Sequence, residues 1–544
     1  MSASENTESR QHARIWLALL LAHLAALLAL GAWVAQQLKP VNMQALHLDE
    51  GERLKCVSYA PFRLPGQTPF DPDLRISREQ IVADLTELVR ITECVRIYSV
   101  GQGLEQVPEI AGALGLKVLL GAWISSDLKL SKLDLDRAID IANRHPATVA
   151  TLIVGNEVLL RRERTAEQMR ELIAYAQART EVPITYADVW EFWVRNQSLA
   201  SAVDRVTVHI LPFWEDQPVA VENAVAHVAA VLDEVRQHFD KPVMIGETGW
   251  PSAGRQREAS QPSRVNQARY IREFVRRAHD QGWDYNLIEA IDQPWKRRLE
   301  GTVGGHWGIL DSTLTPKFPL AGAVAERESY TLPALATLAG AALCLLLAAA
   351  GGRARPATLR LATAAATGAV GALVAALHIE HARLAYRDVP EWSVLGLVAL
   401  LAALVPLLLA RWNASTPIPS AAAAWQTLRT RASARCSSNA CALSLIRGVL
   451  LFAAAVAAVL LFADPRYRDF PTLLYLAPTL VFGVTGWTSV SRHAMEERLC
   501  ASVLALASIA RWLAEPANPQ AIAWLLTCLV FALPFLRRPA REHQ

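Results

Sequence analysis

The stretch VATLIVGNE (residues 149–157) is an apolar, β-branched run that ends abruptly in glycine, asparagine and glutamate. Runs of this kind predict strands buried on both faces, as in parallel sheets. Comparable runs flank it along the chain: LKCVSYAPF, CVRIYSV, LKVLLGAWI, PITYADVW, RVTVHILPFW, KPVMIGETGW and YNLIEAIDQPW. Most are separated by amphipathic helical patterns such as SREQIVADLTELVR (residues 77–90). Eight strand-helix units within residues 40–328 predict an α/β fold, a (β/α)8 TIM barrel, with a doubly wound open sheet as the alternative.

Two predicted strands end in a glutamate. Glu157 closes the fourth strand, and Glu247 closes the seventh within IGETGWPSAG (residues 245–254). In such a barrel the carboxyl ends of the strands converge on one face, where active sites lie. Burying a carboxylate after so apolar a strand is costly unless the site uses it. We therefore expect the two carboxylates to form a pair; the alternatives are a salt bridge from Glu157 to Arg161 or Arg162, and a structural turn role for Glu247.

Paired carboxylates across a barrel mouth suit glycoside hydrolysis. One protonates the leaving oxygen, while the other attacks the anomeric carbon or activates water. A retaining enzyme holds the carboxyl groups about 5–5.5 Å apart, whereas an inverting enzyme holds them further apart to fit a water molecule.

Three motifs carry a resemblance to a known family. VMIGETGWPSAG (residues 243–254) is similar to the nucleophile signature of family 17 of the glycoside hydrolases, the β-1,3-glucanase and β-1,3-glucanosyltransferase family. VGNE (residues 154–157) resembles its acid/base motif, and VRIYS (residues 95–99) resembles its substrate strand. The resemblance spans roughly residues 54–315. It implies a retaining mechanism on β-1,3-glucan, with Glu157 as acid/base and Glu247 as nucleophile.

Further residues near predicted strand ends are candidates for holding the sugar. Asn156 is placed to hold the sugar 2-hydroxyl, a contact that strengthens in the transition state. Glu157 must start protonated, so an apolar setting or the negative charge of Glu247 is expected to raise its pKa. The other candidate substrate-binding residues, for each of which packing is the alternative, are Tyr59, Arg96, Tyr98, Tyr186, His209, Trp214, Trp250 and Trp295. Trp123 also falls at a strand end. We expect no metal and no cofactor.

The predicted eighth strand departs from the family pattern. It reads EAIDQPWK (residues 289–296), where family members carry a phenylalanine-rich strand with a glutamate and a nearby lysine. The family's roles therefore do not transfer securely to Asp292, Gln293 or Lys296.

Hydrophobic runs on both sides of the barrel segment predict membrane spans. Residues 15–34 form an uncharged run long enough to cross a bilayer and lack a clear cleavage site, which indicates an anchor rather than a signal peptide. Seven further runs follow, near residues 332–350, 358–378, 393–410, 447–463, 471–490, 499–513 and 520–536. The predicted organisation is a cytoplasmic N-terminus and anchor (residues 1–39), an extracytoplasmic barrel (residues 40–328) and a polytopic region of about seven helices (residues 329–544).

The loops between these runs differ in positive charge. Under the positive-inside rule they place both termini in the cytoplasm and the barrel in the periplasm of an inner membrane. The arginines on the predicted cytoplasmic side are Arg353, Arg355, Arg360, Arg411, Arg429, Arg431, Arg435, Arg447, Arg492, Arg498, Arg537, Arg538 and Arg541. The opposite short loops carry Arg383, Arg387, Arg466 and Arg468.

The composition limits the partners. The formal net charge of +3 comes largely from these loop arginines, so it gives no indication of nucleic-acid binding. The expected partners are a β-glucan, the lipid bilayer and a glucan synthase. A hydrolase meant only for digestion needs no polytopic anchor, which favours a role in building or remodelling glucan by transfer to another sugar.

Two alternatives from other functional classes stay open. The first is a membrane translocator for glycans or lipid-linked sugars, with the barrel as a binding or trimming appendage; its candidate intramembrane residues are His378, Glu380, His381 and Arg511. The second is a barrel that binds glucan without catalysis.

Cys56 and Cys94 begin neighbouring predicted strands in the exported segment. Adjacent parallel strands rarely offer disulfide geometry, so packed thiols are favoured over a disulfide.

Overall fold

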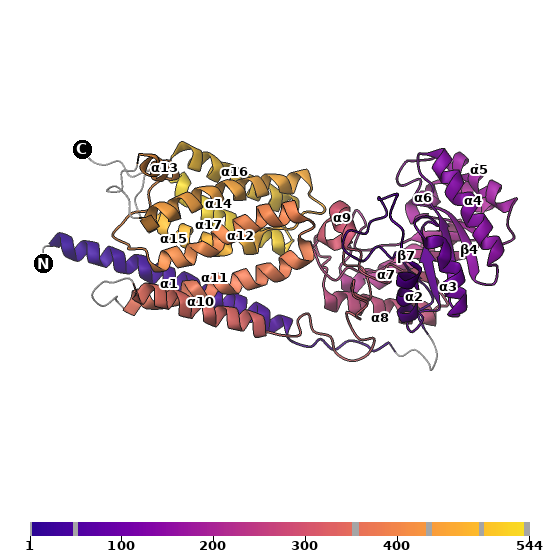
Figure 1. The fold of residues 1–544 in the computed structure, drawn as a ribbon, viewed down its shortest axis with the longest axis horizontal. Coiled ribbons are helices and arrows are strands. Elements are labelled where there is room, and N and C mark those ends of the chain that lie inside the picture. Colours follow the sequence, from indigo (N-terminus) through magenta and orange to yellow (C-terminus); the bar gives the residue numbers. More distant parts are fainter. Residues whose placement is uncertain (1–2, 47–52, 351–357, 431–437, 489–493, 538–544) are drawn as a thin grey trace. The chain divides into compact units, whose positions relative to one another are not determined.

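The structure, a computed structural model, describes residues 3–46, 53–350, 358–430, 438–488 and 494–537 (Figure 1). The chain divides into two compact units. One is Pro40–Val324, and the other combines Met1–Lys39 with Ala325–Gln544.

The first unit is a closed barrel of eight parallel strands, which confirms the predicted fold class. The strands follow one another in chain order, and Val57 on the first pairs with both Val95 on the second and Leu287 on the last. Their bounds are β1 (Val57–Ser58), β2 (Cys94–Ile97), β3 (Lys117–Ala122), β4 (Val149–Asn156), β5 (Ile184–Val189), β6 (Val206–His209), β7 (Val243–Thr248) and β8 (Asp284–Leu287).

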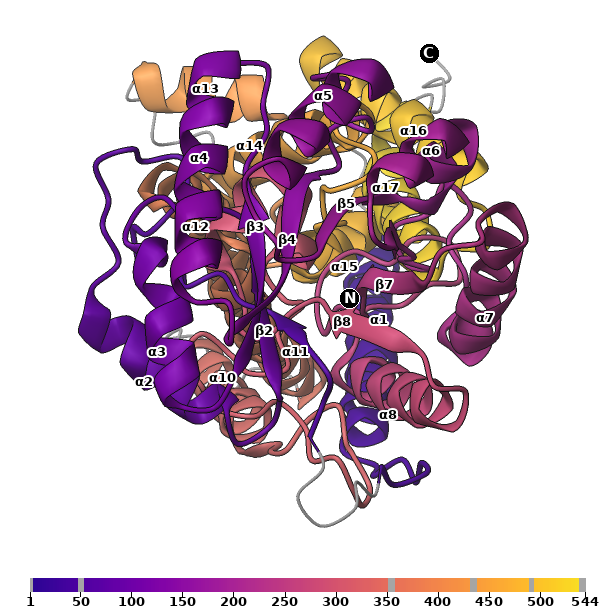
Figure 2. The same ribbon diagram turned by 90° about the vertical axis from the view of Figure 1, so that its right-hand side faces the viewer.

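Helices surround this barrel, as Figure 2 shows for α4, α5, α7 and α8. Their bounds are α2 (Arg78–Leu88), α3 (Val107–Ala113), α4 (Leu128–Arg144), α5 (Ala166–Gln177), α6 (Trp190–Arg195), α7 (Val221–His238), α8 (Arg264–Asp280) and α9 (Arg297–Gly304). Several begin at a side-chain cap that accepts an otherwise unpaired backbone N–H. Ser77, Asp127 and Ser263 cap α2, α4 and α8, and Thr165 forms a capping box with Gln168 on α5.

A disulfide joins Cys56 and Cys94, so the expectation of packed thiols was wrong. Val57 pairs with Val95, which places the residues immediately before them directly opposite each other, with Cα atoms 4.3 Å apart. The two cysteines are separated by 38 positions in the sequence, which span one complete βα unit. Strand register, which the sequence does not reveal, therefore decided the pairing.

The second unit is helical. Its bounds are α1 (Ala3–Gln37), α10 (Thr331–Ala349), α11 (Thr358–Ala385), α12 (Val389–Ala410), α13 (Ala421–Arg429), α14 (Ser438–Ala463), α15 (Thr472–Thr488), α16 (Met495–Ala514) and α17 (Pro519–Leu536). Each of the runs expected to span the membrane overlaps one of these helices, although residues 489–490 of the run 471–490 lie outside the described residues. Of the described helices, six are long and apolar enough to cross a bilayer, in α1, α10, α11, α12, α14 and α17. The described part of α15 is shorter, and α16 carries charged residues at both ends.

A buried ion pair lies inside this unit. Arg447 on α14 and Glu497 on α16 form a buried ion pair with a 2.9 Å separation, and Glu497 also accepts the backbone N–H of Ala421. Of the loop arginines behind the predicted orientation, Arg353, Arg355, Arg431, Arg435, Arg492, Arg538 and Arg541 lie outside the described residues.

The disulfide generates a stability prediction. Replacing Cys56 and Cys94 together with alanine should lower the free energy of unfolding of residues 40–324 by about 2–4 kcal/mol, because the unfolded chain loses a covalent loop constraint. Urea denaturation with and without dithiothreitol measures the change. Reductant should destabilise the wild type and leave the double variant unaffected; an unchanged wild type would contradict the disulfide.

Candidate active site

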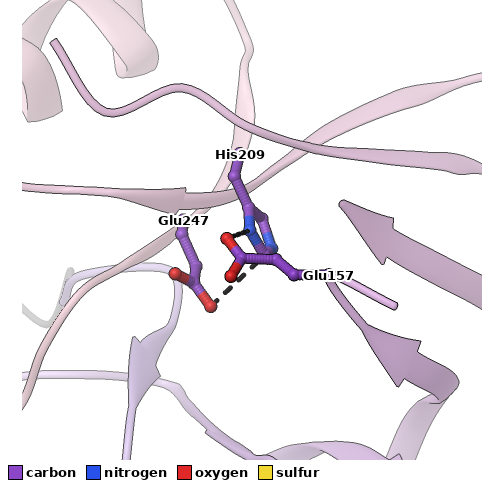
Figure 3. Close-up of side chains that lie close together, drawn as sticks. All are labelled: Glu157, His209 and Glu247. Carbon is purple, nitrogen blue, oxygen red and sulfur yellow. Dashed lines mark hydrogen bonds and ion pairs between the residues drawn. The ribbon is translucent and has the colours of Figure 1, made fainter. Parts of the chain in front are cut away.

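The two strand-end glutamates lie at the same end of the barrel, and their side chains point toward one another with His209 beside them (Figure 3). One ligand atom from each of Glu157, His209 and Glu247 lies within 4.8 Å of the other two. Glu157 directly follows β4, whereas His209 and Glu247 lie on β6 and β7. The barrel therefore brings together, from three separate strands, the pair that the sequence suggested.

Glycine residues allow the backbone to present Glu247. A Cβ added to Gly246 would lie 2.5 Å from the Thr207 side chain, and one added to Gly249 would lie 2.1 Å from the carbonyl oxygen of Ile288. Both distances are too short for any side chain, so β7 can pack here only with glycine on each side of Glu247 and Thr248. Glu157 is presented differently, by a left-handed backbone conformation with φ of 51° just after β4.

The carboxylate of Glu247 is almost entirely buried and is held by cationic and hydroxyl donors. Tyr98 donates its hydroxyl hydrogen to Oε1 at 2.8 Å, and Arg96 Nη1 lies 3.2 Å from the same oxygen. Nε2 of His209 is 3.7 Å away. All three contacts meet at Oε1, so this oxygen is fixed.

Glu157 has a different partner. Its Oε1 lies 2.9 Å from Nδ1 of the buried His209. Burial pushes the pKa of Glu157 upward, but the hydrogen bond and charge of His209, helped by Arg161 and Arg96, outweigh burial and hold the pKa below its ordinary value. The expectation of a raised pKa for Glu157 was therefore wrong. His209 lies on β6, which is separated from β4 in the barrel by the intervening strand β5.

Arg96 connects the parts of the site. Its fully buried guanidinium donates to the carbonyl oxygen of Gly246 at 2.7 Å and to Oδ1 of Asn156 at 2.5 Å. Asn156, expected to hold the sugar, is thereby fixed beside the acid-bearing turn. Arg96 thus links β2 to β4 and β7, and its charge lies between the two carboxylates.

A second polar chain supports Tyr98, and sequence reasoning missed it. The Tyr98 hydroxyl lies 2.8 Å from Oγ of Ser58, which accepts from Nδ2 of Asn286 at 2.8 Å. Asn286 also donates to the carbonyl oxygen of Gly246 at 2.8 Å. Burial raises the pKa of Tyr98, and the charge of Glu247 raises it further, so this hydroxyl remains a donor. A polar residue inside an apolar strand was the available signal for Asn286.

Sequence reasoning also missed Glu289, which follows β8. It is buried, and both carboxylate oxygens lie 3.1 Å from Nζ of Lys296. Burial raises its pKa to about 7 despite the charge of Lys296. Glu289 and Lys296 therefore form a buried pair within EAIDQPWK, the segment whose family roles the sequence left in doubt. An acid directly after an apolar run was the signal, as it was for Glu157 and Glu247.

The other acid of this segment has a structural partner. Asp292 lies 2.8 Å from Nζ of Lys317 and accepts the backbone N–H of Gly308 at 2.9 Å. Gln293 donates to main-chain carbonyl oxygens and accepts from the indole of Trp295.

Three of the candidate sugar-binding residues are buried, and their polar atoms bond to the protein. The Tyr59 hydroxyl donates to Asp84, the Tyr186 hydroxyl donates to Asp188, and the Trp250 indole donates to the carbonyl oxygen of Gln261. The structure places these three in packing rather than on a sugar-accessible surface. Tyr186 still matters locally, because it accepts the backbone N–H of Leu159 and holds the turn after Glu157.

Two candidate tryptophans are half-buried at the strand ends. Trp214 stacks on Trp307 with ring centroids 6.0 Å apart. Trp295 meets Phe70 edge to face at 5.6 Å, and Phe70 is itself exposed.

Glu157, His209 and Glu247 also satisfy the spacing of a metal site. The guanidinium of Arg96, 3.2 Å from Glu247, already supplies a positive charge there and would repel a cation. The arrangement therefore suits acid/base and nucleophilic chemistry better than metal binding.

The barrel sequence matches a described family. Residues 56–308 match the BtgE/BtgC glycoside hydrolase domain. The chain is 25% identical over 264 residues to a glucan 1,3-beta-glucosidase of Saccharomyces cerevisiae, covering 44% of this chain and 83% of that protein. It is 26% identical over 292 residues to a probable glucan endo-1,3-beta-glucosidase of Aspergillus fumigatus, covering 47% of this chain and 41% of that protein.

Solved structures are similar to about half of the chain. A glycoside hydrolase family 17 beta-1,3-glucanosyltransferase from Rhizomucor miehei shares 23% identity, with 49% of this chain and 98% of that chain covered and a TM-score of 0.44. An endo-laminarinase from Formosa shares 19% identity, with 48% and 83% covered and a TM-score of 0.42.

The first site prediction concerns the proton on Glu157. His209→Leu removes the hydrogen bond and charge that lower its pKa, so the pKa of Glu157 should rise. NMR titration of 13C-labelled glutamate carboxyls measures this without relying on activity. His227→Leu, which removes a histidine bonded to Glu215 instead, is the control and should leave Glu157 unchanged. A fall in the pKa of Glu157 on removal of His209 would contradict the assignment.

The second site prediction concerns how the buried carboxyl of Glu289 makes stability depend on pH. Its folded-state pKa of about 7 lies above the ordinary 4.5, so its contribution to stability is complete below pH 4.5 and is lost as pH rises through 7. Lys296→Met removes the charge that lowers this pKa, so the free energy of unfolding should fall by about 3–5 kcal/mol at pH 8 and by less at pH 5. Urea unfolding at both pH values tests this, with exposed Lys132→Met as control. Equal losses at both pH values would refute it.

Proposed function

We propose that this chain, whose barrel is a glycoside hydrolase domain of the family 17 type, is a membrane-anchored retaining enzyme that cleaves β-1,3-glucan and transfers the released glycosyl unit to a sugar acceptor. The observation that carries this proposal is the approach of Glu157 and Glu247 within 4.8 Å. Such closeness suits direct attack by a carboxylate and leaves little room for the water that an inverting enzyme needs. The names of the curated relatives support β-1,3-glucan as substrate.

Glu247 has the surroundings of a nucleophile. Arg96 and Tyr98 hold its Oε1 and stabilise the ionised carboxylate. In the first step Oε2 of Glu247 attacks the anomeric carbon, the bond to the leaving oxygen breaks, and Glu157 gives its proton to that oxygen. The product is a glycosyl ester on Glu247 and an ionised Glu157.

His209 shares the proton of Glu157. The two atoms are 2.9 Å apart, so one proton placed between them serves either as an imidazolium or as a neutral carboxylic acid. The hydrogen bond and charge of His209 lower the pKa of Glu157. A bound sugar excludes water and so disfavours the ionised carboxylate, which favours the protonated Glu157 that the leaving oxygen needs.

The second step reverses the roles. Esterification removes the negative charge of Glu247, so Glu157 can accept a proton from the incoming hydroxyl. That oxygen attacks the anomeric carbon, the ester bond breaks and Glu247 is regenerated. A sugar hydroxyl gives transfer, and water gives hydrolysis.

The membrane unit favours a role in assembly of glucan. Six helices suited to span a bilayer attach to the barrel, and the barrel contains a disulfide, a bond that persists in oxidising compartments. We therefore place the barrel in the periplasm at an inner membrane, both termini in the cytoplasm, and the enzyme beside a glucan synthase whose product it remodels.

The translocator alternative gains no support from the residues suggested for it. His378 bonds to the Tyr386 hydroxyl at 2.9 Å, Glu380 pairs with Arg327, and Arg511 pairs with Glu515 four residues along its own chain segment. These partners give each group a structural role.

The proposed roles predict distinct defects. Glu247→Gln should abolish the glycosyl ester, and Glu157→Gln should slow cleavage of oligosaccharides with a poor leaving group by roughly 10²–10⁴-fold. Mass spectrometry of products from one pure β-1,3-gluco-oligosaccharide measures activity, and a 2-fluoro glycosyl donor should label Glu247 covalently. Glu222→Gln, an exposed carboxylate on α7, is the matched control and should retain activity.

The product distribution separates the possibilities. Products longer than the input establish transfer, and only shorter products establish hydrolysis. An unchanged input with the full-length wild type would overturn the substrate assignment, and label on any residue other than Glu247 would overturn its role.

A further inference from the structure

Helix α13 is amphipathic, and its large apolar side chains are exposed. Ala421, Ala424, Trp425 and Leu428 recur at the spacing that places residues on one stripe of a helix. Ala424 is fully buried, whereas Trp425 and Leu428 are 61% and 54% exposed. The described residues therefore cover the small members of this stripe and leave its large members open.

The small residues of the stripe pack on α14. A Cβ added to Gly448 of α14 would lie 2.7 Å from the Cβ of Ala421, so the two helices approach closely at this glycine. Figure 1 shows α13 at the end of the helical unit where α1 begins. Close packing at Gly448 fixes which side of α13 meets α14, and this fixes the direction in which Trp425 and Leu428 point.

A buried polar cluster holds the start of α13. Glu497 of α16 accepts the backbone N–H of Ala421 at 3.2 Å and pairs with Arg447 of α14. Arg447 and Ser444 each donate to the carbonyl oxygen of Pro419 at 2.7 Å. Backbone groups at a helix start are costly to leave unpaired among apolar helices, and these contacts remove that cost.

This cluster orders α13 before any partner binds. The helix has nine residues, a length that is not stable alone in water. Contacts with Gly448 and Glu497 hold it in place instead. Its exposed side chains therefore lose little freedom when they meet another surface.

The side of α14 that receives α13 continues as exposed apolar surface. Phe452 and Val456 follow Gly448 at intervals of four residues, so all three lie on one side of α14. Phe452 and Val456 are 61% and 40% exposed. Because α14 is long and apolar enough to cross a bilayer, this side is suited to face lipid. The exposed stripe of α13 lies beside that surface.

Exposed positive charge gathers at the same helix ends. Arg429 is in the last turn of α13, Arg411 follows α12, and Arg498 is in the first turn of α16. Asn439, at the start of α14, donates to the carbonyl oxygen of Arg411 at 3.1 Å. Among the described residues of these helix ends, Glu496 is the one exposed carboxylate. The excess of arginine is complementary to anionic phospholipid headgroups.

We propose that α13 is an interfacial helix that binds the surface of an anionic phospholipid bilayer. Trp425 and Leu428 lie at the boundary of the acyl chains, and Arg429 contacts headgroup phosphates. An apolar stripe bearing tryptophan, flanked by arginine, is typical of helices that lie in this layer. The inference rests on the membrane attachment within the proposed function and not on the glucan chemistry.

The test uses the full-length protein in nanodiscs that contain equal parts of phosphatidylcholine and phosphatidylglycerol. The photoreactive residue benzoylphenylalanine replaces Trp425, Leu428, Gln426 or Phe452, one at a time, and mass spectrometry measures lipid adducts after irradiation. Positions 425 and 428 should give lipid adducts as abundant as those at position 452. Gln426, which is exposed on another side of α13, is the matched control and should give almost none.

Arg429→Gln provides a second readout. With the probe at position 428, the ratio of phosphatidylglycerol to phosphatidylcholine in the adduct should fall about fivefold, the factor that corresponds to about 1 kcal/mol for one arginine near an anionic surface. Arg137→Gln, which removes an exposed arginine from α4 of the barrel, should leave the ratio unchanged. Equal capture of the two lipids by the protein with Arg429 intact would overturn the preference for anionic lipid.

The outcomes separate this inference from the proposed function. A probe at Phe452 that captures no lipid defeats the membrane attachment itself. Lipid capture at Phe452 without capture at Trp425 and Leu428, or with equal capture at Gln426, overturns the inference about α13 alone. Capture of another protein chain in place of lipid at Trp425 also overturns it.

Discussion

Two carboxylates within 4.8 Å of each other in a buried barrel mouth repel one another, and the surrounding side chains are arranged to offset that repulsion. At this separation two like charges cost about 3 kcal/mol for an effective dielectric constant of about 20. Arg96 lies against Glu247, and His209 lies against Glu157. These two contacts offset the repulsion between the two carboxylates, so that both can lie close together in the barrel mouth.

The same contacts give the two carboxylates different chemical surroundings. Glu247 faces a permanent cation and a tyrosine hydroxyl, neither of which gives up a proton at ordinary pH. Glu157 faces an imidazole, which exchanges its proton readily. Under the proposed function, one glutamate is therefore kept as the nucleophile and the other is connected to a mobile proton. The difference arises from partners on β2 and β6 and not from the glutamates' own neighbours in sequence.

The apolar helices that precede and follow the barrel in the chain bear on where the proposed reaction takes place. The barrel is joined along the chain to described helices that are long and apolar enough to cross a bilayer. Under the proposed function, transfer requires that an acceptor sugar reach the glycosyl ester before water does.

Sequence pattern alone determined the alternation of strands and helices, the closed barrel, the hydrophobic runs and the strand-end positions of Glu157 and Glu247. Each of these follows from local periodicity, or from the rule that parallel strands end on one face. The family motifs added the expected chemistry, and even Glu289 had a visible signal after its apolar strand.

Only the tertiary structure decided the pairing of Cys56 with Cys94, the partnership of His209 with Glu157 and the burial of Tyr59, Tyr186 and Trp250. It also reversed the expected direction of the Glu157 pKa. The physical reason is common to all of them. Strand register, burial and the electrostatic field at a carboxylate depend on groups that closure of the barrel brings close together. The distances between those groups in the fold cannot be read from their separation along the sequence.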